Sequence, residues 1–316
     1  MSGIFQVVEV LVILAVLLSL AAILSWYERR LLAGFQERLG PNRVGPFGLL
    51  QPMADVVKLF SKEDWVPPFA ERFIFVLAPT VVPTTVLLAF AAVPFTERIW
   101  VTDVNIGLLF ILGMLSLGVY STTFGGWASN SKYSLIGSLR GAAPMISYEL
   151  PLGLSLVGVV MLAGSFRLTD IVRAQSPLWF IVLQPLGFLI FMIAGFAEAR
   201  RIPFDLPEAE NELVAGYHTE YSGMKFALFY MGEYLDITLI SALITVLFLG
   251  GWRGPFLPPI LWFVLKLGTM INIFIWVRSI LPRYRFDQLM HLGWKVLLPL
   301  ALANIVITGA VVLAIR

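Results

Sequence analysis

The sequence predicts an all-α integral membrane protein with eight transmembrane helices, and three observations lead to this prediction. Of the 316 residues, 59% are hydrophobic and only 13% are charged. The mean hydropathy is +0.86, and the apolar residues fall into long uninterrupted runs. A soluble domain typically carries roughly 25% charged residues, so this composition suits the interior of a bilayer. We expect residues 1–316 to form a single membrane domain.

Eight apolar stretches are long enough to cross a membrane. A bilayer core of about 30 Å requires roughly 20 residues in a helix. The predicted spans cover residues 4–25, 73–94, 106–126, 143–163, 177–198, 226–249, 256–281 and 292–315. Prolines inside them predict kinks, which membrane helices tolerate where neighbouring helices satisfy the freed carbonyl groups. These prolines are Pro79, Pro83, Pro144, Pro151 and Pro185.

Lysine and arginine are unevenly distributed between the two sets of loops, and this predicts the orientation in the membrane. The cations of the loop after the first span are Arg29, Arg30, Arg38, Arg43, Lys58, Lys62 and Arg72. Those on the opposite side are Arg98, Arg167, Arg173, Arg253 and Arg316. We therefore expect the more basic side to be cytoplasmic and both termini to lie on the outer, periplasmic side. No basic residue precedes the first apolar run, so we expect a retained span rather than a cleaved signal peptide.

The amino-acid composition excludes several kinds of site. The chain has no cysteine, which excludes disulfides, thiolate metal sites and iron–sulfur clusters held by this chain. Its two histidines, His218 and His291, are too few for a multi-histidine metal or haem site. We expect no cofactor and no metal bound by this chain alone, so any redox chemistry must lie in a partner or a diffusible molecule. The net charge of +2 gives no indication of nucleic-acid binding.

The first cytoplasmic loop contains two patterned segments. Residues 40–48 are rich in glycine and proline but lack the Gly-Lys-Ser/Thr ending of a P-loop. They predict a tight turn, or a rigid loop that presents Arg43 to a partner. Residues 49–60 place apolar side chains on one helical face and polar ones on another. They predict an amphipathic helix in the plane of the membrane surface, either as a simple anchor or as one wall of an opening for a lipid-soluble ligand.

Four charged residues fall inside predicted spans, where a charge costs about 2.5–3.5 kcal/mol on insertion scales. They are Glu149, Glu233, Asp236 and Lys266. Glu233 and Asp236 are spaced i,i+3 and therefore share a helix face. Charges at this depth usually face a polar interior and mark a pathway. The alternative is a structural pair, for example between Lys266 and an acid.

A long acidic cytoplasmic loop, about residues 199–225, joins the fifth and sixth predicted spans. With Glu198 just before the loop, its carboxylates are Asp205, Glu208, Glu210, Glu212 and Glu220. The run Asp205–Glu208 has the form of a helix capping box and predicts a short helix from Leu206 to Ala215. Crowded carboxylates raise one another's pKa because like charges disfavour ionisation, so we expect a cluster that holds and passes protons. The alternatives are a solvated charged loop and a hard-cation site, although the regular EF-hand spacing is missing.

Motifs spread over nearly the whole chain carry a family resemblance. They are Glu28-Arg29-Arg30, 40–45, Lys62-Glu63-Asp64, 129–133, 146–149, 203–212, 220–223, Gly232-Glu233-Tyr234 and 283–288. Together they resemble the H subunit of proton-pumping NADH:quinone oxidoreductase, respiratory complex I, whose mitochondrial counterpart is subunit 1. The run Pro-Phe-Asp-Leu-Pro-Glu-Ala-Glu is the most specific of them. One departure is Ala199-Arg200-Arg201 after Glu198, where many relatives read Thr-Asn-Arg.

The resemblance implies a bacterial inner-membrane subunit that joins the membrane arm to the peripheral arm. It implies that quinone enters between the first span, the interfacial helix and the sixth span, and is reduced in a chamber shared with peripheral subunits. Iron–sulfur clusters and FMN would lie in those partner subunits, with quinone as the substrate. The implied proton path comprises Glu149, Glu198, Asp205, Glu208, Glu210, Glu212, Glu220 and Glu233. The implied quinone-binding or partner-facing residues are Arg29, Arg30, Arg43, Arg283 and Arg285.

Two other functions fit the same pattern of residues. One is the equivalent subunit of a membrane-bound hydrogenase or of a dehydrogenase with another electron donor. The other is an independent ion transporter, which would also carry acids inside the membrane. The sequence shows no internal repeat of the kind that many transporters have, and its patterned loops all lie on one side.

Overall fold

The computed structural model describes residues 2–176, 178–207 and 215–315, and the regular elements in these ranges are helices. Seven of the described helices are long and apolar enough to cross a membrane. They are α1 (Ser2–Phe35), α3 (Arg72–Phe90), α4 (Gly107–Ala128), α5 (Lys132–Ala163), α10 (Gly223–Phe248), α11 (Pro259–Ile280) and a C-terminal run of α12 (Phe286–His291), a π-helical segment (Leu292–Leu297) and α13 (Leu298–Ile315). This confirms an all-α, multi-pass membrane protein.

The predicted fifth span, residues 177–198, is divided. Its described part forms the short helix α7 (Phe180–Leu183) and then α8 (Pro185–Glu198). Proline is favoured in the first turn of a helix, where its missing N–H group is not needed, so Pro185 starts a new helix instead of kinking an existing one. Helix α8 is apolar but shorter than the seven long helices. The count of eight spans therefore stays a prediction.

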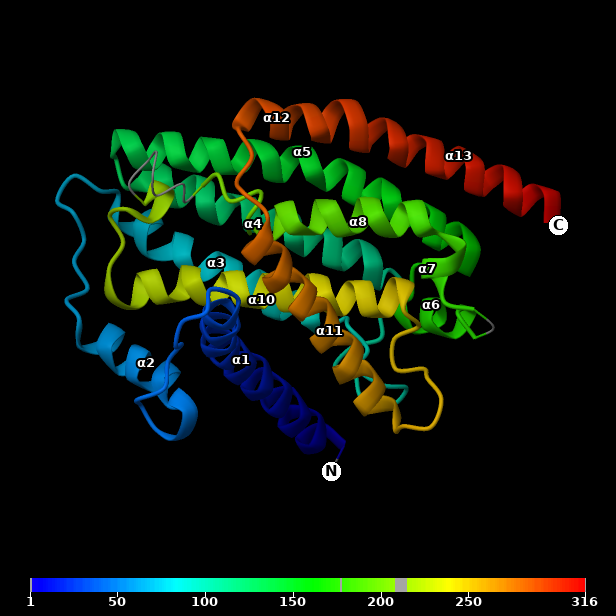
Figure 1. Cartoon of the computed structure of the whole chain (residues 1–316), viewed down its shortest axis with the longest axis horizontal. Helices are drawn as coiled ribbons and strands as arrows, with labels where there is room; N and C mark the ends of the chain where they lie inside the picture. The colour runs from blue at the N-terminus through cyan, green and yellow to red at the C-terminus, as the bar shows by residue number, and fades with distance from the viewer. Residues whose placement is uncertain (1, 177, 208–214, 316) are drawn as a thin grey trace.

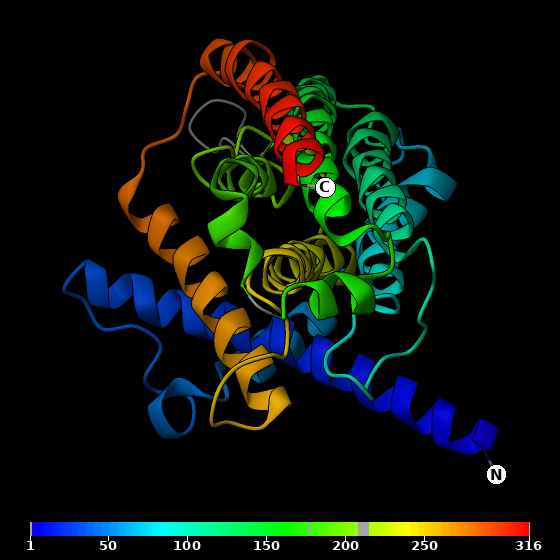
Figure 2. The same ribbon diagram turned by 90° about the vertical axis from the view of Figure 1, so that its right-hand side faces the viewer.

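Helix α10 is the central element of the fold. Figure 2 shows it nearly end-on, with the other long helices arranged around it. The apolar window of α10 is 94% buried, whereas those of the other six long helices are between 17% and 50% buried. A helix enclosed on all sides presents its side chains to protein rather than to lipid. Its two acids, Glu233 and Asp236, are accordingly buried inside the protein.

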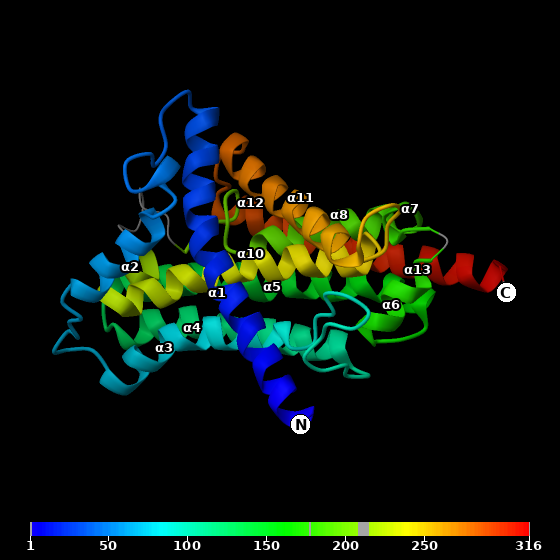
Figure 3. The ribbon, with the colours of Figure 1, turned by 90° about the horizontal axis from the view of Figure 1, so that it is seen from below.

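The remaining helices define two sides of α10. Helices α1 and α11 cross α10 obliquely, while α13 lies along α5 and α8 on the opposite edge (Figures 1 and 3). The short helix α6 (Leu168–Ala174) packs against α5 and α10 near the end of the bundle. Two 3₁₀ turns, η1 (Pro46–Gly48) and η2 (Gly216–His218), lie in the loops that follow α1 and precede α10.

The predicted amphipathic segment does form a helix, α2 (Gln51–Ser61), which contacts α1 and α10. On its other face Met53, Val57 and Phe60 are 67–68% exposed, as expected for a helix that rests on a membrane surface. The turn before it requires glycine, because Gly48 has a φ of +75° and a Cβ at this position would lie 2.2 Å from the carbonyl oxygen of Pro41.

The acidic loop is described only at its two ends. Glu208, Glu210 and Glu212 lie outside the described residues, as does most of the helix predicted from Leu206 to Ala215. Leu206 and Pro207 have no helical conformation, and after residue 214 the chain enters the 3₁₀ turn η2. The short helix therefore stays a prediction.

Candidate functional site

Two consecutive arginines that follow α8 pair with the two acids of α10. Arg200 donates from Nη2 to Oδ2 of Asp236 at 2.7 Å, and Nη2 of Arg201 lies 3.5 Å from Oε2 of Glu233. The four side chains are all buried. Because acids spaced i,i+3 lie one turn apart on one helix face, each of the neighbouring arginines meets its own acid. The predicted shared face of Glu233 and Asp236 is thus confirmed, and both charges are compensated as burial requires.

Glu28, near the cytoplasmic end of α1, adds a third acid to this buried cluster. It accepts a hydrogen bond from Arg278 of α11, and its Oε1 lies 3.7 Å from Nη1 of Arg201. Arg201 also lies with its guanidinium carbon 4.7 Å from the centre of the Tyr234 ring, within the range of a cation–π interaction. The cluster therefore joins α1, α10 and α11 through charged side chains.

A polar cavity of about 230 Å³ borders this ion cluster. The residues that line it combine the ion cluster with polar and apolar rings, and they are Glu28, Arg29, Leu32, Arg201, Tyr217, His218, Phe226, Phe229, Tyr230, Glu233, Tyr234 and Arg278. Aromatic side chains with a polar tip offer an apolar body and a hydrogen-bonding group together. The lining therefore suits a ligand with an aromatic or quinoid ring and polar oxygens.

A separate apolar groove of about 140 Å³ lies between α1, α2 and α10. Its lining residues are Leu18, Ala21, Ala22, Ser25, Pro52, Asp55, Val56, Leu59, Ala227, Tyr230, Met231 and Tyr234. Tyr230 and Tyr234 line both this groove and the polar cavity, and their hydroxyl oxygens are 3.0 Å apart. The apolar groove and the polar cavity therefore adjoin at this pair of tyrosines.

Five described acids form a line through the protein in which each acts electrostatically on the next. In order they are Asp205, Glu233, Asp236, Glu198 and Glu149. Four of them are on the predicted proton path, and Asp236 is one of the charges predicted within a span. Glu149 is half-buried and accepts a hydrogen bond from Ser116 of α4. Glu220 is half-buried after η2 and is not among the residues that line the polar cavity.

Asp205 is buried at the start of the acidic loop, with Arg283 beside it. Arg283 donates from Nη2 to Oδ2 of Asp205 at 2.7 Å. Burial raises the pKa of the Asp205 carboxyl, and this effect prevails over the opposing effect of the Arg283 cation. Arg283 therefore holds the acidic loop to the segment between α11 and α12.

The five arginines predicted to bind quinone do not gather in one place. Arg29 lines the polar cavity and pairs with Asp55 of α2, whereas the other four are absent from that lining. Arg30 donates to the carbonyl oxygen of Phe47 at 2.6 Å and so holds the glycine-rich loop. The remaining two are exposed, and of these Arg285 pairs with the adjacent Asp287 while Arg43 lies at the surface of the loop.

Lys266 of α11 binds backbone carbonyl groups rather than an acid. Its Nζ donates to the carbonyl oxygens of Leu249, Gly251 and Arg253 at 2.6, 3.0 and 2.6 Å. The ammonium also lies 4.4 Å from the centre of the Trp179 ring. The example of an ion pair between Lys266 and an acid is wrong, because the C-terminal end of α10 supplies the oxygen atoms that this cation needs.

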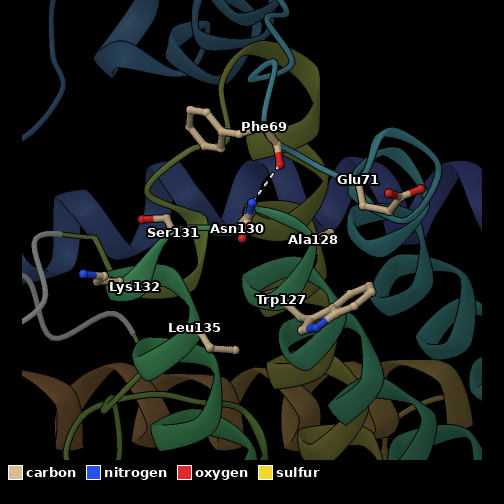
Figure 4. A pocket seen from close by; sticks show the side chains of 8 residues that line it. All are labelled: Phe69, Glu71, Trp127, Ala128, Asn130, Ser131, Lys132 and Leu135. Carbon is tan, nitrogen blue, oxygen red and sulfur yellow. Dashed lines mark hydrogen bonds between the residues drawn. The ribbon is translucent and has the colours of Figure 1, made fainter.

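Another cavity, of about 360 Å³, lies where α3, α4 and α5 meet. Figure 4 shows Lys132 and Glu71 on opposite sides of it, and Asn130, which donates to the carbonyl oxygen of Phe69 at 3.1 Å. None of the predicted site residues lines this cavity. Among the described residues, no group of three or more His, Asp or Glu side chains is arranged to hold a metal ion.

The sequence alone does not reveal four members of the buried cluster as site residues. They are Glu28, Arg200, Arg201 and Arg278. A signal was present for the two consecutive arginines, because two cations directly after an apolar helix and shortly before an acidic run favour internal pairing. No comparable signal exists for Glu28 and Arg278, which are separated by 250 positions and meet only through the packing of α1 against α11.

Comparison with known proteins covers nearly the whole chain. A family profile described as NADH dehydrogenase matches residues 8–309. A second-copy H subunit of the NADH-quinone oxidoreductase of Syntrophobacter fumaroxidans is 58% identical, over 97% of this chain and 96% of the relative. The corresponding second-copy H subunit of Geobacter sulfurreducens is 57% identical over 96% of this chain and 95% of the relative. The H subunit of the Methylococcus capsulatus enzyme is 57% identical over 96% of this chain and 98% of the relative. The chain therefore belongs to the NADH dehydrogenase family, as an H-type subunit of the NADH-quinone oxidoreductase complex.

Proposed function

We propose that this subunit admits quinone from the bilayer, forms part of the chamber in which quinone is reduced, and couples the reduction to proton translocation. The observation that carries this proposal is the junction at Tyr230 and Tyr234, where an apolar groove open between α1, α2 and α10 meets a cavity lined by charges. An amphipathic molecule with an apolar tail and a polar ring matches both spaces at once.

The apolar groove supports the access route. It is bounded by a membrane span, by the amphipathic helix α2 and by the central helix α10, so a molecule dissolved in the bilayer reaches it without crossing water. The quinone tail would lie against Leu18, Met231 and Leu59, while the ring passes the tyrosine pair. The peripheral-arm subunits would supply the rest of the chamber together with the iron–sulfur clusters and FMN that deliver electrons.

The line of acids supports the coupling. Reduction of a quinone by two electrons takes up two protons, so the charge of the bound molecule changes during the reaction. A change of charge beside Glu233 alters the proton affinity of that acid and of its neighbours, and Glu198 and Glu149 would carry the effect toward the membrane arm. Glu208, Glu210, Glu212 and Glu220 of the acidic loop would extend the same line toward the quinone. In this arrangement the subunit lies in the bacterial inner membrane with both termini on the periplasmic side.

A bulky substitution in the apolar groove tests the access route. Ala22→Trp adds an indole to the groove, and Ala15→Trp adds the same group to an exposed position of the same helix. In membrane vesicles with assembled complex, we expect Ala22→Trp to raise KM for a long-tailed quinone about tenfold, equivalent to ~1.4 kcal/mol. Ala15→Trp should match the wild type. NADH oxidation by a hydrophilic artificial acceptor should be normal in both variants, and wild-type quinone kinetics in Ala22→Trp would refute the route.

A further inference from the structure

Arg200 is a buried cation whose hydrogen-bonding capacity is only partly used. It adopts a φ of +53°, a left-handed conformation that residues other than glycine rarely take. Its Nη2 donates to Asp236, while its Nε and Nη1 have no hydrogen-bond partner among the described residues. Arg200 therefore has a fixed anchor on α10 and unpaired donors beside it.

Glu198 lies two residues earlier and has the complementary property. Its side chain is only 4% exposed, and its Oε2 has no hydrogen-bond partner within the described part of the chain. The charged groups that act on it are Arg200 from its own segment, Asp236 from α10 and Glu149 from α5. Three carboxyl groups thus share one guanidinium, and Asp236 holds it by the hydrogen bond.

We propose that Arg200, anchored by Asp236, is a positioning residue that sets the charge state of Glu198 within the line of acids. This inference rests on the proposed proton path. A carboxylate in direct contact with the guanidinium would be held ionised, and a buried carboxyl group without a nearby cation would remain protonated. Glu198 has an intermediate environment, because it experiences the charge of Arg200 without receiving its hydrogen bond. That environment allows its carboxyl oxygen to bind a proton and release it again.

The two partners should act on Glu198 in opposite directions. Arg200→Gln removes the cation, so the ratio of protonated to ionised Glu198 should rise by about tenfold or more, as loss of an opposite charge at close range implies. Asp236→Asn frees the guanidinium for Glu198, so the same ratio should fall. Arg200→Lys keeps the positive charge and should stay near the wild-type ratio.

Infrared difference spectroscopy on the assembled complex measures this ratio directly, through the carbonyl band of a protonated carboxyl group. The band of Glu198 is the one that Glu198→Gln removes. Arg173→Gln serves as control, because Arg173 is an exposed arginine paired at the opposite end of the bundle. The proposal is overturned if Glu198→Gln removes no band, or if its band is the same in Asp236→Asn as in the wild type. The latter comparison needs no variant that lacks the buried cation, so it remains decisive if Arg200→Gln does not assemble.

Proton pumping in the same vesicles separates this inference from the proposed function. If Glu198→Gln pumps normally in assembled complex, the proposed proton role of Glu198 is wrong, whatever its infrared band shows. If Glu198→Gln loses pumping while the band is insensitive to both Arg200→Gln and Asp236→Asn, only the role given to Arg200 is wrong. Loss of pumping together with opposite shifts of the band supports both.

Discussion

Arg29 of α1 donates a 2.7 Å hydrogen bond from Nη2 to Oδ2 of Asp55 in α2, so an ion pair ties the amphipathic helix to the first span. Gln51 of α2 donates to the other carboxylate oxygen, Oδ1, at 3.1 Å. Asp55 also lines the apolar groove, and Arg29 lines the polar cavity. One wall of the proposed quinone route is therefore held in place by a pair within this chain.

Breaking the pair should loosen α2 without unfolding the protein. Both side chains are partly exposed, so we expect Asp55→Asn to cost about 0.2–1 kcal/mol of stability. Amide hydrogen exchange in α2 should become faster, and KM for a long-tailed quinone should rise severalfold. Arg29→Gln should give the same result if the arginine acts by holding α2. A defect in Arg29→Gln with wild-type behaviour in Asp55→Asn would show instead that Arg29 contacts quinone itself.

The pair between Asp205 and Arg283 predicts a pH dependence. Burial raises the pKa of Asp205 above the ordinary value of 3.8, so the folded state binds a proton more tightly there than the unfolded chain does. Stability should therefore fall as pH rises from the ordinary value through the raised one. Arg283→Ala should extend this loss to higher pH, because the cation that favours ionisation is gone. Thermal unfolding of the complex across the acid to neutral range measures the effect, and Asp205→Asn should remove it.

Arg283→Ala should also weaken quinone turnover more than NADH oxidation by artificial acceptors, because the loosened acidic loop borders the proposed chamber. Equal losses in the two assays would mean general misassembly. A pH dependence that persists unchanged in Asp205→Asn would contradict the assignment to this carboxyl.

The ammonium of Lys266 stabilises the end of α10 through three carbonyl groups. Lys266→Met keeps much of the side-chain volume but leaves these buried oxygens without their donor, so it should destabilise the protein by about 1–3 kcal/mol. The matched control is Leu265→Met, at an adjacent position that is 52% exposed. Thermal unfolding of the purified complex compares them, and equal midpoints would mean that the carbonyl contacts contribute nothing.

Close packing of α4 against α5 depends on a glycine. A Cβ on Gly126 would lie 2.4 Å from the Cβ of Ser138 and 2.5 Å from the carbonyl oxygen of Ser134. Gly126→Ala should therefore cost about 1–3 kcal/mol, the usual penalty of overpacking. Gly113→Ala, on the same helix, meets nothing within 4 Å and should be neutral or slightly stabilising. Similar unfolding temperatures for the two variants would argue against a tight helix contact at Gly126.

Most of the helices could be predicted because a bilayer imposes a length of apolar sequence. Their ends could not, since they depend on packing. Helix α5 begins at Lys132, before the apolar run of 143–163, because its polar first turns pack against η2, where a Cβ on Gly137 would lie 2.8 Å from Gly216. Helix α1 likewise continues to Phe35, through charged residues that find partners in α2 and α11.

The acids of the site could be predicted better than their partners. A carboxylate such as Glu149 or Glu233 is conspicuous within an apolar run, whatever surrounds it. The cation that compensates it is an ordinary loop arginine until the fold brings the two together, as Arg201 meets both Glu28 and Glu233. The roles of Glu208, Glu210 and Glu212 stay predictions, because these residues lie outside the described part of the chain.

The near-complete enclosure of α10 has a consequence for biogenesis. A lone acid at the centre of an inserting helix costs about 2.5–3.5 kcal/mol, and α10 carries two. Synthesis proceeds from the N-terminus, so Arg200 and Arg201 leave the ribosome before Glu233 and Asp236, whereas Arg278 follows with α11. The charge pairs that make α10 acceptable to the membrane are thus available from the segment made just before it. Residues 200–236 are therefore expected to enter the bilayer as one cooperative unit, in which the loop assists the insertion of the helix.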